Sequence, residues 1–154
     1  MAKNDKKKAI LLMAALIAII IILIMLWPLS FLNAIADDTE LRIVFWQPAI
    51  TSEPVAYEVQ PGTEKHRQIR QVLGQYSYRR TWRTFFFWDS PLNNDALGTG
   101  YTFNLYELGD AGNYISSSGT GEIIVNGRIY RIGYWGNRKA SKMTDELRSV
   151  LAGQ

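Results

Sequence analysis

Three arginines in an aromatic stretch are the residues of this chain best suited to bind a ligand. They are Arg79, Arg80 and Arg83, within the segment 78–88, which reads YRRTWRTFFFW. A guanidinium group is a planar fork of N–H donors that binds phosphate or carboxylate through two parallel hydrogen bonds. The segment therefore predicts an anion site, for a wall phosphate or a partner's carboxylates, with Trp82 as a neighbouring aromatic contact.

The same segment also has a purely structural interpretation. Its aromatic composition favours a strand over 76–88, in which alternate side chains point to opposite faces. Both faces become apolar towards residue 88, as in a central strand buried on both sides. The arginines would then stack on aromatic rings or pair with acids. We favour this interpretation over the anion site and leave both open.

A second aromatic pair, Tyr134 and Trp135, stands before Gly136 and Asn137. A tryptophan in a loop can stack on a sugar ring or anchor a protein interface, because it is large and rigid. It can equally fill the gap between a sheet and the last helix, and we favour that role. The two residues are secondary binding candidates.

Catalytic and metal-binding patterns are weak in this sequence. His66 is the one histidine and there is no cysteine, so a zinc site would need carboxylates, which show no diagnostic spacing. No serine lies in a Gly-x-Ser-x-Gly motif, and residues 119–121 (GTG) lack the Lys-Ser/Thr ending of a phosphate-binding loop. The sequence predicts no enzyme, no metal and no cofactor.

The carboxylates do not change this prediction. A glycosidase needs two of them across a cleft, and no spacing selects a pair from Glu53, Glu58, Asp89, Asp95, Glu107, Asp110 and Glu122. Residues 89–95 offer oxygen ligands to calcium but lack the spacing and glycine of an EF-hand. Local turns that use the side chains of Asp and Asn are the favoured interpretation of that loop.

The elements that must position these residues form an α+β pattern. Periodicity and turn residues predict the order ββαβββββα, a mostly antiparallel sheet with two helices packed on one face. Thr63 and Ser141 are the expected helix caps, with Gly74 and Gly153 at the helix ends. The expected strands are 41–46, 55–59, 76–88, 101–108, 114–118, 122–125 and 128–134, and the expected helices are 64–73 and 142–151.

The hairpin is the sharpest local prediction. Asn126-Gly127 separates two β-prone runs, and a two-residue type I′ turn needs positive φ at both central residues, which Asn-Gly supplies. Residues 114–118 come just before and are expected to pair as a third antiparallel strand.

The N-terminus directs the chain to a membrane. A basic tail over residues 1–8 precedes an uncharged segment, 9–36, of which residues 9–27 would make a helix of about 30 Å, the thickness of a bilayer's hydrocarbon core. Residues 34–36 (AIA) match a signal-peptide cleavage site, so a cleaved leader is an alternative to a retained anchor. We favour the anchor because the apolar run is long. Either way the basic tail stays in the cytoplasm and the domain, 37–154, lies outside it.

Net charge and cysteine content limit the kinds of partner and site that the domain can have. Four of the seventeen basic residues and one of the fourteen acidic residues lie in the first eight positions, so the domain carries thirteen of each sign. A neutral domain has no electrostatic reason to bind nucleic acid. The absence of cysteine excludes disulfides, thiolate metal sites and a lipidated cysteine, which fits an exported domain of a Gram-positive bacterium.

One resemblance adds to this interpretation. The segments 112–115 (GNYI), 121–136 (GEIIVNGRIYRIGYWG) and 78–81 (YRRT) resemble small membrane-anchored extracytoplasmic domains of Gram-positive bacteria. The resemblance covers under half of the domain. It implies a location and a rough fold, and it carries no catalytic or binding residue.

Together these features predict a non-catalytic binding or regulatory module, held at the membrane to contact a protein partner or an anionic wall polymer. A small envelope hydrolase is one alternative. A structural subunit of a membrane complex is another, because Ala14, Ala15 and Ala18 would let helices approach closely.

Overall fold

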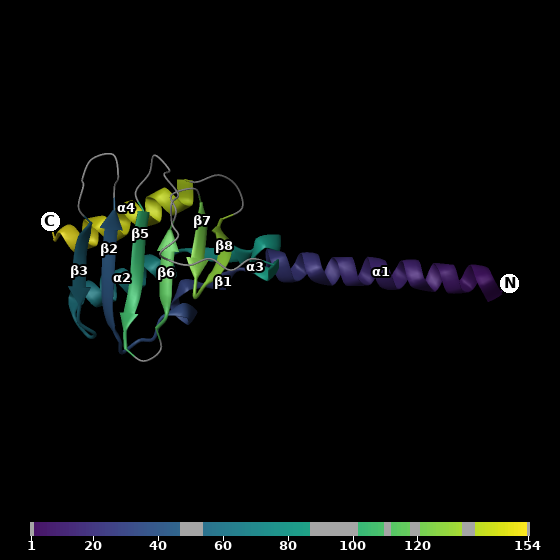
Figure 1. Cartoon of the computed structure of the whole chain (residues 1–154), viewed down its shortest axis with the longest axis horizontal. Coiled ribbons are helices and arrows are strands. Elements are labelled where there is room, and N and C mark those ends of the chain that lie inside the picture. The colour runs from purple at the N-terminus through teal and green to yellow at the C-terminus, as the bar shows by residue number, and fades with distance from the viewer. Residues whose placement is uncertain are drawn as a thin grey trace.

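The structure is a computed structural model, and it describes residues 2–46, 54–86, 102–109, 112–117, 121–133 and 138–153. Within these ranges, eight strands form one antiparallel sheet in the order β1-β4-β8-β7-β6-β5-β2-β3 (Figure 1). The strands are β1 (Leu29–Ser30), β2 (Glu40–Trp46), β3 (Val55–Val59), β4 (Ser77–Arg80), β5 (Thr102–Leu108), β6 (Tyr114–Ser117), β7 (Glu122–Val125) and β8 (Arg128–Ile132).

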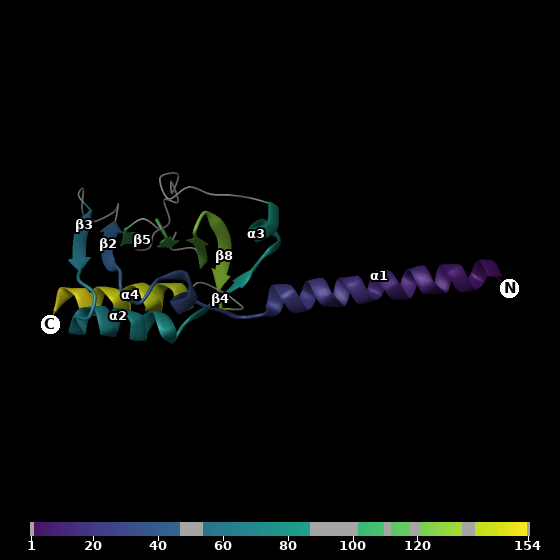
Figure 2. The same cartoon turned by 90° about the horizontal axis from the view of Figure 1, so that it is seen from below.

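Two helices, α2 (Glu64–Gly74) and α4 (Arg138–Ala152), lie together against one face of the sheet (Figure 2). The strands alternate accordingly: in β2, Leu41, Ile43 and Phe45 are buried towards the helices, and Arg42 between them is exposed. This is the period-2 pattern of a sheet with one covered face. The α+β class and the antiparallel sheet predicted from the sequence are confirmed.

The predicted hairpin is confirmed at its turn. Asn126 and Gly127 have φ angles of 49° and 78°, as a type I′ turn requires. Strand β7 pairs with β8 across this turn, and β6 pairs with β7 on the other side. Thr63 is also confirmed as the N-cap of α2, since its side chain accepts a hydrogen bond from the amide of His66 at 3.2 Å.

The predicted strand over 76–88 is wrong after Arg80. The chain instead forms the short helix α3 (Trp82–Phe86). The side chain of Thr84 accepts a hydrogen bond from the amide of Thr81 at 2.8 Å, and the amide of Thr84 donates to the carbonyl of Thr81 at 3.0 Å. This reciprocal capping of the first turn outweighs the strand preference of the aromatic residues that follow. Residues 87 and 88 lie outside the described ranges.

Ser141 is not the cap of the last helix, because α4 begins at Arg138. Ala140 is 1% exposed and shares a helix face with Met143, Thr144 and Leu147, all buried. That spacing of three, four and seven residues extends the apolar stripe one turn earlier than the sequence suggested. Gly153, with φ of +70°, follows the helix as predicted.

The N-terminal helix α1 (Ala2–Leu26) projects from the domain (Figure 1). Its segment Lys6–Leu26 is long and apolar enough to cross a membrane, by length and composition. After α1 the chain forms β1 and the 3₁₀ helix η1 (Phe31–Ala34). Phe31, Ala34 and Ile35 are buried in the same core as α2 and α4. The folded domain therefore includes residues 29–36, which the sequence assigned to the anchor segment.

Candidate functional site

The structure separates the arginines that the sequence grouped. Arg79 and Arg80 are neighbours in β4, so their side chains leave opposite faces of the sheet. Arg80 lies on the face of α2 and α4, at the end near α1, and its Nη1 donates to the carbonyl of Ile24 at 3.4 Å. Arg79 lies on the other face. A single anion site made by all three predicted arginines is therefore not what the structure shows.

Arg79 and Arg83 do lie on the same face, in one charged cluster. Arg79 is aligned with Arg131 across β4 and β8, and Arg131 is aligned with Glu122 across β8 and β7. Arg83, from α3, forms an ion pair with Glu122 at 2.5 Å. Like charges directly opposite on a sheet repel one another, so Glu122 offsets part of that cost. Arg79 is only 9% exposed, so it is not open to a large ligand, and the Arg83–Glu122 ion pair attaches α3 to β7.

Helix α3 covers the sheet on the side opposite α2 and α4. Ile124 and Ile129 are 4% and 3% exposed there, although their side chains point away from the main core. Thr84 donates a hydrogen bond to the carbonyl of Ile129, and Arg128 Nη1 donates to the carbonyl of Thr84 at 3.2 Å. These bonds attach α3 to β8.

Trp82 is exposed on α3, as are Phe85 and Phe86. The short helix thus attaches through its polar residue and leaves its aromatic residues at the surface. Tyr134 and Trp135, the secondary candidates, lie outside the described residues. Their binding role stays a prediction.

A different surface emerges from the open part of the sheet. Arg42, Tyr106 and Tyr114 form one row across β2, β5 and β6, on the face away from α2 and α4. The rings of the two tyrosines have centroids 6.4 Å apart and planes tilted by 37°. Among the described residues no helix covers these three strands on this face, which Figure 1 shows towards the viewer. We call the three residues the Arg-Tyr row.

The open face is hollowed beside this row. An open pocket of about 470 Å³ is lined by Arg42, Val44, Tyr106, Glu107 and Leu108. Burial raises the pKa of the Tyr106 phenol, while the nearby Arg42 acts in the opposite direction. The phenol therefore stays protonated near neutral pH and can donate a hydrogen bond. The Arg-Tyr row combines a cation, phenol donors and flat rings, a set suited to oxygen-rich groups on a partner.

His66 and Glu107, which were considered as catalytic candidates, are both buried in the structure. His66 is 3% exposed on the core side of α2, and its Nε2 has no hydrogen-bond partner among the residues that the structure describes. Glu107 is 5% exposed and accepts hydrogen bonds from the Ala36 amide and from Asn113 Nδ2. Within the described ranges, no three His, Cys, Asp or Glu residues come together as metal ligands. Residues 89–95, the calcium-loop candidate, lie outside those ranges.

Sequence reasoning missed the Arg-Tyr row, although a signal for it exists. Arg42 is the one charged residue in the predicted strand 41–46, and period 2 puts it on the face opposite residues 41, 43 and 45. The tyrosines could not be assigned to that face without the register of three strands. Comparison with protein-family models, with curated proteins and with solved structures finds no match to this chain.

Proposed function

We propose that this chain is a single-pass membrane protein whose domain, outside the cytoplasm, is a non-catalytic binding module. Its open sheet face contacts a protein partner. The observation that carries the proposal is the Arg-Tyr row: an arginine and two tyrosines aligned on a face that the described helices leave open. Arginine and tyrosine are enriched among residues that dominate the free energy of protein association.

The shape of the face favours a protein over a small molecule. The pocket beside the row is open, and small-molecule sites are usually enclosed clefts that bury most of their ligand. A sheet face with mixed aromatic and polar side chains fits a protein surface with carboxylates or carbonyls at its centre. An anionic wall polymer would meet the same cation and donors, and it is the other outcome that the test can give.

The test is site-specific crosslinking in cells. A photoreactive phenylalanine analogue replaces Tyr106, and in a control it replaces Ser149, which is exposed on α4. We expect a discrete crosslinked protein band from position 106 alone. That band should weaken when Arg42 is changed to Ala and should persist in the matched variant Arg138→Ala, another exposed arginine. A diffuse product of heterogeneous mass from position 106 alone would identify a wall polymer and contradict a protein partner. Products from neither position, or equal products from both, would contradict a binding role for this face.

The orientation has its own test, because the chain contains no cysteine. A basic segment preceding an apolar helix is retained in the cytoplasm, and Lys6, Lys7 and Lys8 are such a segment. In intact cells, a membrane-impermeant maleimide should label Ser149→Cys and leave Asn4→Cys unlabelled. The reverse pattern would place the domain in the cytoplasm.

A further inference from the structure

We propose that α3 is a lipid-contact element: Trp82, Phe85 and Phe86 enter the headgroup region of the leaflet from which the domain emerges. The inference rests on the proposed membrane anchoring and goes beyond it, because it assigns a second membrane contact and fixes which side of the domain faces the bilayer.

The first observation is the exposure of three large aromatic side chains on a five-residue helix. Trp82 is 59% exposed, Phe85 is 47% exposed and Phe86 is 75% exposed. Single exposed apolar residues are ordinary, but a contiguous apolar patch marks a contact surface. Tryptophan is enriched where membrane meets water, because its ring is apolar and its N–H is polar.

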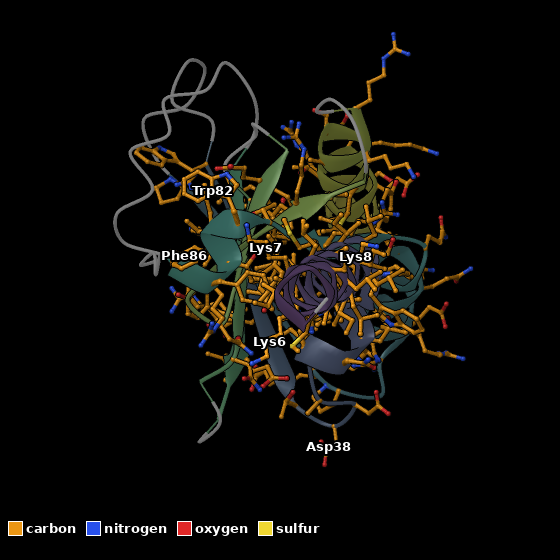
Figure 3. The ribbon with its side chains drawn as sticks, turned by 90° about the vertical axis from the view of Figure 1, so that its right-hand side faces the viewer. Lys6, Lys7, Lys8, Asp38, Trp82 and Phe86 are labelled. Atoms are coloured by element: carbon orange, nitrogen blue, oxygen red, sulfur yellow. The ribbon has the colours of Figure 1, made fainter. Side chains whose placement is uncertain are left out.

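The second observation is the position of α3 relative to α1. Figures 1 and 2 show the helix beside the domain's α1 end, at the level along the axis where α1 stops. Figure 3 looks along α1 from its N-terminal side, and Trp82 and Phe86 appear to one side of it. A bilayer crossed by α1 and ending near Trp27, which is 68% exposed, would have its surface at α3.

The third observation is that the domain packs directly against the end of α1 and is not joined to it by a linker alone. Helix α1 contacts β4, and a pocket between them is lined by Leu23, Ile24, Trp27 and Arg80. The bond from Arg80 to the carbonyl of Ile24 satisfies a backbone acceptor in the last turn of α1. Because β4 leads directly into α3 through Thr81, this contact sets the height of α3 above the bilayer core.

Charge on α3 does not oppose the contact. Arg83 is the one charged residue of α3, and it is paired with Glu122 of β7. The helix itself contains no carboxylate that would repel an anionic headgroup. Arg80 lies at the end of the domain near α1 and uses its Nη1 for the Ile24 carbonyl, so its other guanidinium donors can bind a lipid phosphate. A transmembrane helix of a partner protein could contact the same aromatic residues instead of lipid. Vesicles that contain no other protein distinguish the two contacts.

The experiment uses the full-length chain reconstituted into phosphatidylcholine and phosphatidylglycerol vesicles. The cysteine-free sequence allows single-cysteine variants labelled with an environment-sensitive fluorophore. The variants are Trp82→Cys and Phe86→Cys on α3, Ser149→Cys on the exposed side of α4, and Leu16→Cys in α1. Quenching is measured with lipids carrying a nitroxide in the headgroup region and, separately, in the middle of the acyl chain.

We expect both α3 labels to emit at shorter wavelength than the Ser149 label and to be quenched several-fold more by the headgroup nitroxide. The Leu16 label should be quenched by the acyl-chain nitroxide. If the α3 labels match Ser149 while Leu16 is quenched, the anchor stands and the lipid contact is overturned, leaving a protein as the occupant. If Leu16 is not quenched by lipid either, the anchor itself fails. Urea unfolding of each variant before labelling shows that the exposed substitutions leave the fold intact.

Discussion

The backbone amide of Ala36 donates a hydrogen bond to the carboxylate of Glu107, which lies 71 residues later in the chain. The second oxygen of the same carboxylate accepts from Asn113 Nδ2 at 2.7 Å. Glu107 thereby joins the segment after α1 to β5 and to the start of β6. The segment that links helix to domain is part of the fold, and this has consequences for stability and for processing.

Removing the Glu107 carboxylate should destabilise the domain. In Glu107→Ala, the Ala36 amide and the Asn113 side chain both lose their acceptor, and unmade hydrogen bonds to a charged group cost about 1–3 kcal/mol. We expect the free energy of unfolding in urea to fall by that amount. Glu58→Ala, on the exposed side of β3 and opposite Arg42, is the control. It removes one exposed cross-strand charge pair, which contributes about 0.2–1 kcal/mol, so its effect should be smaller. Equal effects of the two substitutions would show that the Glu107 bonds carry no net stability.

The leader should remain attached to the domain. Cleavage after Ala36 would remove Phe31, Ala34 and Ile35 from the core, and Phe31 is 0% exposed. Replacing one buried phenylalanine with alanine costs about 3–5 kcal/mol, a large share of the roughly 5–15 kcal/mol that stabilises a domain. We therefore expect Phe31→Ala to unfold at much lower urea concentration than the native chain.

Whether the native protein keeps residues 28–36 can be measured from its intact mass after extraction from membranes. A mass that includes residues 28–36 is expected. A stable, folded protein beginning at Asp37 would contradict this prediction and would make the segment 29–36 dispensable. For the same reason, a soluble form of the domain should be begun at Pro28 rather than at Asp37.

The parts of the fold that the sequence predicted correctly are those in which local pattern and tertiary packing agree. The β-prone composition of residues 41–46 predicts a strand, which the structure shows as β2, and the Asn126-Gly127 turn fixes the register of β7 and β8. Strand β1 was missed because its two residues, Leu29 and Ser30, lie just after Pro28 within an uncharged segment that continues to Ala36, and two residues are too few to show a strand pattern. Its identity as a strand comes only from pairing with β4.

The site was harder to predict than the fold because it depends on which face each side chain takes. A strand through residue 88 would place Arg80 and Trp82 on one face, but α3 breaks that alternation after Arg80. The bond from Thr84 to the carbonyl of Ile129 joins residues 45 positions apart. No window of sequence around α3 contains that contact.

Thr84 should control whether α3 forms. Its hydroxyl accepts from the Thr81 amide and donates to the Ile129 carbonyl, and it is 3% exposed. Thr84→Val keeps the shape and removes both bonds, so we expect a loss of about 1–3 kcal/mol in unfolding free energy. Hydrogen exchange at the Thr81 amide should also become faster. Thr84→Ser retains the hydroxyl and is the matched control. If the valine and serine variants behave alike, the hydroxyl does not hold α3.

The buried tyrosines should make the domain sensitive to alkaline pH. Burial raises the pKa of Tyr78 to about 12, with Tyr130 adding in the same direction and Arg80 opposing. Its ring packs on Phe31 at 4.6 Å and on Tyr130 at 4.8 Å between centroids. Burial and the hydrogen bond to Glu146 raise the pKa of Tyr76 as well.

The sign follows from the protons bound by each state. In the unfolded chain a tyrosine ionises near pH 10, while folded Tyr78 keeps its proton up to about pH 12. Between those values the unfolded state binds fewer protons, so the free energy of unfolding falls as the pH rises. Below about pH 10 Tyr78 is protonated in both states, and its contribution to the free energy of unfolding is fully present. Tyr78→Phe removes this group, so its unfolding free energy should decline less steeply between about pH 9.5 and 12 than that of the native chain. The unfolding free energies of the two proteins are measured by urea titration across that range. If they decline in parallel, Tyr78 ionises alike in the folded and unfolded states, and its ring is not buried between Phe31 and Tyr130.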